Sequence, residues 1–212
     1  FDGAMSHANV YINGQKVGYW PYGYNSFHFD ITKYLKPGEK NTLAVRLENL
    51  PESSRWYPGA GLYRNVHLIV TEDAYIPVWG TYITTPSVNE KFAKVNVLTK
   101  VVLPEGADPA KYSVETSVWN PNKQKLTAVR TSLAQMKYNN DQAEQEFVIQ
   151  DPFLWSPEMP ALYSAETRLY EGDKLKDIYT TPFGIRSIEI IPDKGFFLNG
   201  KRTVFKGVCN HH

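Results

Sequence analysis

The chain has 212 residues, of which 42% are hydrophobic and 14% aromatic, enough to bury one large core or two modest ones. Twenty-three Lys and Arg residues against 22 Asp and Glu residues leave a formal net charge of +1. This balance argues against bulk nucleic acid or an anionic membrane as a partner, and no apolar run approaches the roughly 20 residues that span a bilayer.

Cys209 is the only cysteine, so the sequence holds no intramolecular disulfide and no cysteine metal cluster. It also lacks a Gly-Lys-Ser/Thr phosphate loop and the ligand spacing of a zinc site. The chain begins with Phe1 rather than Met and continues to His212 without a stop signal. We therefore expect a piece of a longer protein, although the two final histidines could instead begin a purification tag.

Short runs that alternate apolar and polar residues, punctuated by 14 Gly and 14 Pro, predict an all-β chain. The first runs, at 10–12 and 17–19, flank Asn13-Gly14, a dipeptide that tolerates the positive φ angles of a two-residue hairpin turn. Similar runs follow at 43–47 and 66–70. Strands that bury one face need a second sheet, so these residues predict a β-sandwich whose early strands would precede Phe1.

A second set of alternating runs begins after residue 71. They lie at 94–103, 112–119, 126–133, 144–149 and 162–170, with turn-forming residues between them. About seven short strands over ~100 residues fit an immunoglobulin-like sandwich without its cysteine pair. The boundary is expected near residues 72–77, and three tryptophans, Trp79, Trp119 and Trp155, are expected in the core of this second domain.

A third pattern follows residue 186. The apolar run 196–198, the turn Asn199-Gly200 and the run 201–207 predict another hairpin.

Several motifs in this order carry a family resemblance over nearly the whole chain. They are Phe1-Asp2-Gly3, Val10 to Gly14, Phe27 to Thr32, Trp56 to Arg64, Leu154 to Tyr163, Phe183 to Arg186, Phe197 to Lys201 and Lys206 to His212. In these the chain resembles glycoside hydrolase family 2. The resemblance implies a truncated sugar-binding jelly-roll domain at 1–73, an immunoglobulin-like β-sandwich at 74–186 and, at 187–212, a short lead into a (β/α)8 catalytic barrel that the chain does not contain.

The segment 53–59 is most similar to the β-galactosidase branch, which implies a retaining enzyme for terminal β-D-galactosides as the parent protein. Retention needs two carboxyl groups about 5 to 5.5 Å apart. In the family both glutamates lie later in the barrel, so no catalytic residue and no activity are expected in this chain. β-Glucuronidase, β-mannosidase and a non-enzymatic carbohydrate-binding or adhesion module remain as alternatives.

Asn89-Glu90 matches the Asn-Glu pair that carries the family's acid/base. It falls in the second domain, however, between Pro86 and the strand expected near Lys94. We therefore interpret Glu90 as a solvated loop charge.

Arg55 and Trp56 are the first candidates for substrate binding, because a pyranose is held by polar groups and by stacking on an aromatic ring. The alternative is that Trp56 packs in the sandwich and Arg55 pairs with a carboxylate. Asn210, His211 and His212 are the second candidates, since they would reach the rim where barrel enzymes place their sites. The family typically has an Asn-Arg-His-Glu-like sequence there, and His211 could equally be structural.

The resemblance implies no cofactor in this segment, although some members of the family use magnesium and sodium near the barrel mouth. Glycans containing β-galactosides are the expected partners, and a homo-oligomer is left open. The compartment is undetermined; glycan degradation favours a periplasmic or extracellular location over a cytoplasmic one.

Overall fold

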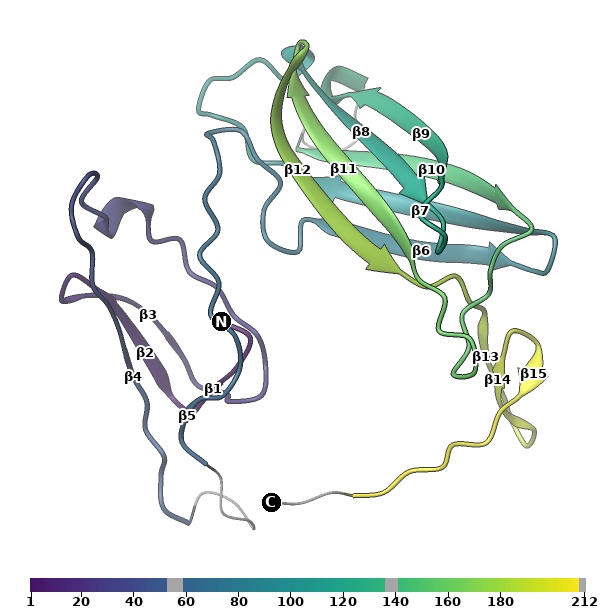
Figure 1. The fold of residues 1–212 in the computed structure, drawn as a ribbon, viewed down its shortest axis with the longest axis horizontal. Coiled ribbons are helices and arrows are strands. Elements are labelled where there is room, and N and C mark those ends of the chain that lie inside the picture. The colour runs from purple at the N-terminus through teal and green to yellow at the C-terminus, as the bar shows by residue number, and fades with distance from the viewer. Residues whose placement is uncertain (53–58, 136–140, 210–212) are drawn as a thin grey trace. The chain divides into compact units, whose positions relative to one another are not determined.

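The computed structural model describes residues 1–52, 59–135 and 141–209, and the regular secondary structure of these residues is almost entirely β-strand, as the sequence predicts (Figure 1). They divide into two compact units, one of Phe1–Ile69 together with residues 207–209 and one of Val70–Lys206. Helical structure in the described ranges consists of three short 3-10 turns, η1 (Thr32–Tyr34), η2 (Pro109–Lys111) and η3 (Leu133–Gln135). No helix found there has the length and apolar character needed to cross a membrane.

The first unit contains two small antiparallel sheets. Strands β1 (Ala4–Met5) and β5 (Gly61–Leu62) form one, and β3 (Gln15–Trp20), β2 (Ala8–Ile12) and β4 (Leu43–Arg46) form the other, in that order. The predicted hairpin is confirmed: Asn13 and Gly14 adopt φ angles of 52° and 81° between β2 and β3. Alternate residues of β2 pack with Phe27 in the core of this unit.

The strand predicted at 66–70 is wrong. This segment has no strand structure, and its apolar side chains are largely exposed. A strand needs a backbone partner along its length, and the described residues place none beside it. Alternation shows which face a strand would bury, but not whether another strand lies next to it.

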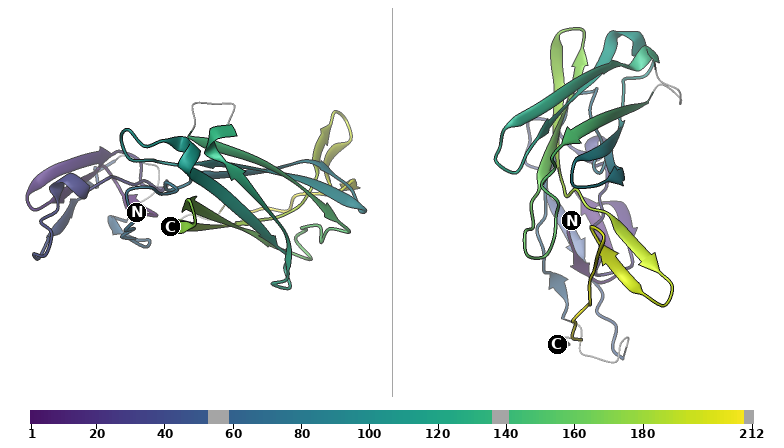
Figure 2. Two further views of the ribbon diagram at one scale, coloured as in Figure 1. Left: turned by 90° about the horizontal axis from the view of Figure 1, so that it is seen from above. Right: turned by 90° about the vertical axis from the view of Figure 1, so that its right-hand side faces the viewer.

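The second unit contains an antiparallel sandwich of seven strands, which confirms the immunoglobulin-like expectation (Figures 1 and 2). One sheet has the order β10 (Gln142–Gln150), β7 (Phe92–Lys100) and β6 (Thr81–Val88). The other has the order β12 (Lys174–Phe183), β11 (Tyr163–Glu171), β8 (Tyr112–Trp119) and β9 (Lys125–Ser132).

The core of this sandwich comes from every second residue of the central strands. Ala93, Val95 and Val97 on β7 meet Val118 on β8 and Ala165 on β11. One of the polar side chains buried with them is that of Gln145 on β10, which is 2% exposed; its Nε2 donates to the carbonyl oxygens of Val114 (3.1 Å) and Val129 (2.9 Å) and to Thr131 Oγ1 (3.1 Å). Gln145 therefore joins the two sheets through hydrogen bonds inside an apolar core.

The prediction that Trp79 is a core residue is wrong. It lies in the turn before β6 with a φ angle of 57°, and it is 58% exposed. The core prediction is also wrong for Trp119, which is half-buried and pairs with Ser164 on the outer face of its sheet. Trp155 is half-buried as well. Tryptophan is well buried on average, but a turn with positive φ places its side chain outside the strand alternation.

A three-stranded sheet ends the second unit, formed by β13 (Ile188–Ile191), β14 (Gly195–Leu198) and β15 (Lys201–Arg202). The hairpin predicted at Asn199-Gly200 is confirmed, with φ angles of 51° and 74°. The Asn199 side chain accepts a hydrogen bond from the Ser187 N–H and donates one to the carbonyl oxygen of Trp155, both at 3.0 Å. These bonds tie the small sheet to the loop that precedes β11.

Candidate functional site

The five substrate-binding candidates from the sequence lie outside the described residues. They are Arg55, Trp56, Asn210, His211 and His212. On one side of the first pair, Glu52 has a φ angle of 55°, and on the other side Gly61 has a φ angle of 138°. The roles of the five residues stay predictions.

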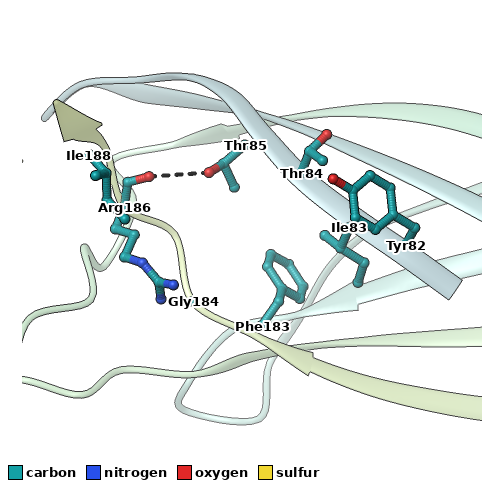
Figure 3. A pocket seen from close by; sticks show the side chains of 8 residues that line it. All are labelled: Tyr82, Ile83, Thr84, Thr85, Phe183, Gly184, Arg186 and Ile188. Carbon is teal, nitrogen blue, oxygen red and sulfur yellow. Dashed lines mark hydrogen bonds between the residues drawn. The ribbon is translucent and has the colours of Figure 1, made fainter. Parts of the chain in front are cut away.

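A groove of about 460 Å³ lies in the second unit, between β6 and the segment that follows β12 (Figure 3). Its lining comprises Tyr82, Ile83, Thr84, Thr85, Phe183, Gly184, Arg186 and Ile188. Thr85 Oγ1 donates to the carbonyl oxygen of Arg186 at 3.2 Å, which fixes the segment against the edge strand. The Arg186 guanidinium lies 5.0 Å from the centre of the Trp155 ring, a cation–π geometry.

The polar side chains of this groove are hydrogen-bonding groups. The groove offers hydroxyl groups from Tyr82, Thr84 and Thr85 and a guanidinium from Arg186, but no carboxyl group. Hydrolysis of a glycoside with two carboxyl groups therefore cannot be built from its lining. Arg186 ends the Phe-Gly-Ile-Arg motif noted in the sequence, whereas nothing in the sequence pointed to Tyr82.

A cluster of carboxylates surrounds Lys176 on β12, within the second unit. The ammonium lies 2.6 Å from Glu72, 2.9 Å from Asp73 and 3.8 Å from Glu171, and the Lys176 side chain is 6% exposed. Hydrogen bonds from Lys176 hold the pKa of Glu72 and that of Asp73 below their usual values, and they raise the pKa of Lys176. A general acid needs a carboxyl group with a raised pKa. We therefore interpret this cluster as a structural group of ion pairs and not as an acid/base site.

Glu90 lies in an exposed bend between β6 and β7, which confirms the interpretation as a loop charge. The neighbouring Asn89 side chain accepts hydrogen bonds from the N–H groups of Lys91 (2.8 Å) and Phe92 (3.0 Å) and so forms the turn. Within the described ranges, no three His, Cys, Asp or Glu side chains gather in a way that could hold a metal ion.

Comparison with known families finds two matches that together span most of the chain. The model of "Glycosyl hydrolases family 2, sugar binding domain" matches residues 1–72, and that of "Glycosyl hydrolases family 2" matches residues 75–186. The described residues of both regions form β-strands, short 3-10 turns and the loops between them.

Individual relatives extend the match over the full chain. β-Galactosidase BoGH2A of Bacteroides ovatus is 40% identical over 213 residues, which is 100% of this chain and 25% of the relative. A β-glucuronidase of Bacteroides fragilis is 35% identical, over 100% of this chain and 32% of the relative. A crystal structure of a glycosyl hydrolase family 2 member from Bacteroides cellulosilyticus superposes with a TM-score of 0.90 at 33% identity, over 100% of this chain and 29% of that one. The chain thus spans about a quarter to a third of the length of these proteins.

Proposed function

The chain belongs to glycosyl hydrolases family 2, and we propose that it forms the non-catalytic N-terminal part of a retaining enzyme that hydrolyses terminal β-D-galactosides. The observation that carries the galactoside preference is the 40% identity, over the whole chain, to a β-galactosidase. The domain limits that we propose are 1–73, 74–186 and 187–212, close to the limits of the two family matches.

A non-catalytic role is supported by the chemistry of the carboxylates discussed above. Glu90 is a solvated charge in a bend, and Glu72 and Asp73 are ionised partners of Lys176. A retaining enzyme needs one carboxyl group that can donate a proton and a second that can attack the anomeric carbon. In this proposal both belong to the part of the protein beyond this chain.

We assign substrate positioning to the segment that carries Arg55 and Trp56. A guanidinium donates up to five hydrogen bonds in a planar fork, and an indole offers an apolar face to the C–H groups of a pyranose. Asn210, His211 and His212 are the second proposed contributors, because an amide and neutral imidazoles can bond to sugar hydroxyls. Both assignments rest on residue chemistry and on the family resemblance.

A second candidate is a β-glucuronidase, favoured by the 35% identity to that enzyme from Bacteroides fragilis. The two functions differ at C6 of the sugar, where a glucuronide carries a carboxylate and a galactoside a hydroxymethyl group. The test is the kcat/KM of the full-length protein on p-nitrophenyl β-D-galactoside and on p-nitrophenyl β-D-glucuronide. We expect the galactoside to be preferred at least tenfold; preference for the glucuronide would replace the proposal with the second candidate.

A further inference from the structure

A second groove lies on the outer face of the sheet β12-β11-β8-β9, away from the core of the sandwich. It has a volume of about 430 Å³, within the range of sites that hold small ligands. All of its lining comes from the second unit, from strands β8, β11 and β12 and the loops next to them.

The pairing of β8, β11 and β12 places apolar side chains along one side of this groove. Trp119 on β8 pairs with Ser164 on β11, and Ser164 pairs with Pro182 on β12, so the three side chains form one row on the outer face. Leu162, next to the row, is 52% exposed. This side of the groove therefore holds the half-buried Trp119 indole, with Pro182 on the far side of Ser164 and Leu162 next to the row.

Polar side chains lie beside these apolar ones. Glu166 pairs with Thr180 in the next outward row, and its side chain is 25% exposed. Arg168 donates from Nε at 2.9 Å and from Nη2 at 2.8 Å, both to Glu166 Oε1. Both contacts restrain the Glu166 carboxylate through the same oxygen. Lys123, exposed in the turn after β8, supplies an ammonium donor on the same groove.

An indole beside aliphatic groups matches the C–H face of a pyranose, and a fixed carboxylate, an ammonium and hydroxyl groups match its hydroxyls. A single carboxylate is insufficient for glycoside hydrolysis with two carboxyl groups. We propose that this groove is an accessory site on the immunoglobulin-like domain that binds one pyranose unit of a glycan. The choice of ligand class rests on the proposed function; the location of the site does not.

The test titrates the ¹⁵N-labelled 212-residue chain with methyl β-D-galactopyranoside and with a β-galacto-oligosaccharide. We expect weak, saturable binding, with shifts at the Trp119 indole and at the amides of Glu166 and Thr180. Glu166→Gln should weaken binding at least fivefold, and Lys123→Ala should weaken it as well. Glu115→Gln is the matched control, because Glu115 lies on the outer face of the same sheet and does not line the groove.

Several results would overturn the proposal. These are the absence of any shift at tens of millimolar sugar, shifts confined to residues outside the groove, and an affinity that Glu166→Gln leaves unchanged in a folded protein. The proposed function is tested separately, since activity of the full-length protein on a chromogenic galactoside does not need this groove. Activity without binding here would reject the accessory site alone.

Discussion

The ammonium of Lys176 on β12 lies 2.6 Å from a carboxylate oxygen of Glu72, a residue just ahead of the immunoglobulin-like domain in the chain. Asp73 adds a second contact at 2.9 Å, and the Lys176 side chain is almost completely buried. The residues that precede the sandwich are thus held to one of its edge strands by charge.

This contact predicts a pH-dependent stability. The pKa values of Glu72 and Asp73 are lowered in the folded protein, so their contribution is present above their usual pKa values of 4.5 and 3.8 and is lost as the pH falls through the lowered values. Lys176→Met should lower the melting temperature near pH 7, and its difference from wild type should shrink near pH 3. Lys174→Met is the control, because its exposed ammonium is 3.5 Å from Glu72. Equal effects of the two variants in thermal melts would contradict this assignment.

The buried side chain of Gln145 predicts a larger loss of stability, in the core of the sandwich. Replacing Gln145 with Ala removes the N–H donors that Nε2 shares among three acceptors and leaves a cavity between the sheets, which should lower the free energy of unfolding by about 2–4 kcal/mol. Urea titration measures this change. Gln150→Ala, an exposed end of the same strand, should have almost no effect. A loss below about 0.5 kcal/mol at Gln145 would show that its bonds contribute little.

The side-chain hydrogen bonds of Asn199 predict a local effect on hydrogen-exchange protection in and next to the small sheet. Asn199→Gly keeps a residue that tolerates positive φ, but it removes the side-chain bonds to Ser187 and Trp155. Hydrogen exchange should lose protection at the Ser187 amide by about 1–2 kcal/mol. The Thr203 amide, which donates to Phe196 within the sheet, should keep its protection. Loss of protection at both amides would mean that the turn itself had changed.

The sequence predicts most of the second sandwich because its strands bury one face. The expected run 112–119 coincides with β8, and both Asn-Gly turns form where the dipeptides occur. The predictions for the segment 66–70, Trp79 and Trp119 are wrong for a shared reason: local pattern carries no information about which backbone lies alongside, which face of a sheet a residue takes or where a turn directs a side chain.

The candidate site could be predicted only through the resemblance. The resemblance points to Arg55 and Trp56, whose chemistry also suits a sugar, and the described residues do not include them. No pattern in the sequence points to the outer groove. Trp119 and Glu166 are 47 positions apart in the chain, and only the pairing of β8 with β11 brings them to the same groove.

Arg55→Ala in the full-length protein tests the proposed positioning role. Removing a charge-assisted hydrogen bond worth about 1.5–3 kcal/mol should lower kcat/KM for a β-galactoside roughly ten- to hundredfold. The melting temperature of the variant is the control for folding. Unchanged kinetics together with unchanged stability would assign Arg55 to a surface role.

The most direct test compares the purified 212-residue chain with the full-length protein on p-nitrophenyl β-D-galactoside at equal molar concentration. A chain without the nucleophile and the proton donor has no route through a glycosyl-enzyme intermediate. We predict turnover by the full-length protein and none by the chain. Turnover by the chain that persists through rigorous purification, or a full-length protein that leaves the galactoside intact, would contradict the account.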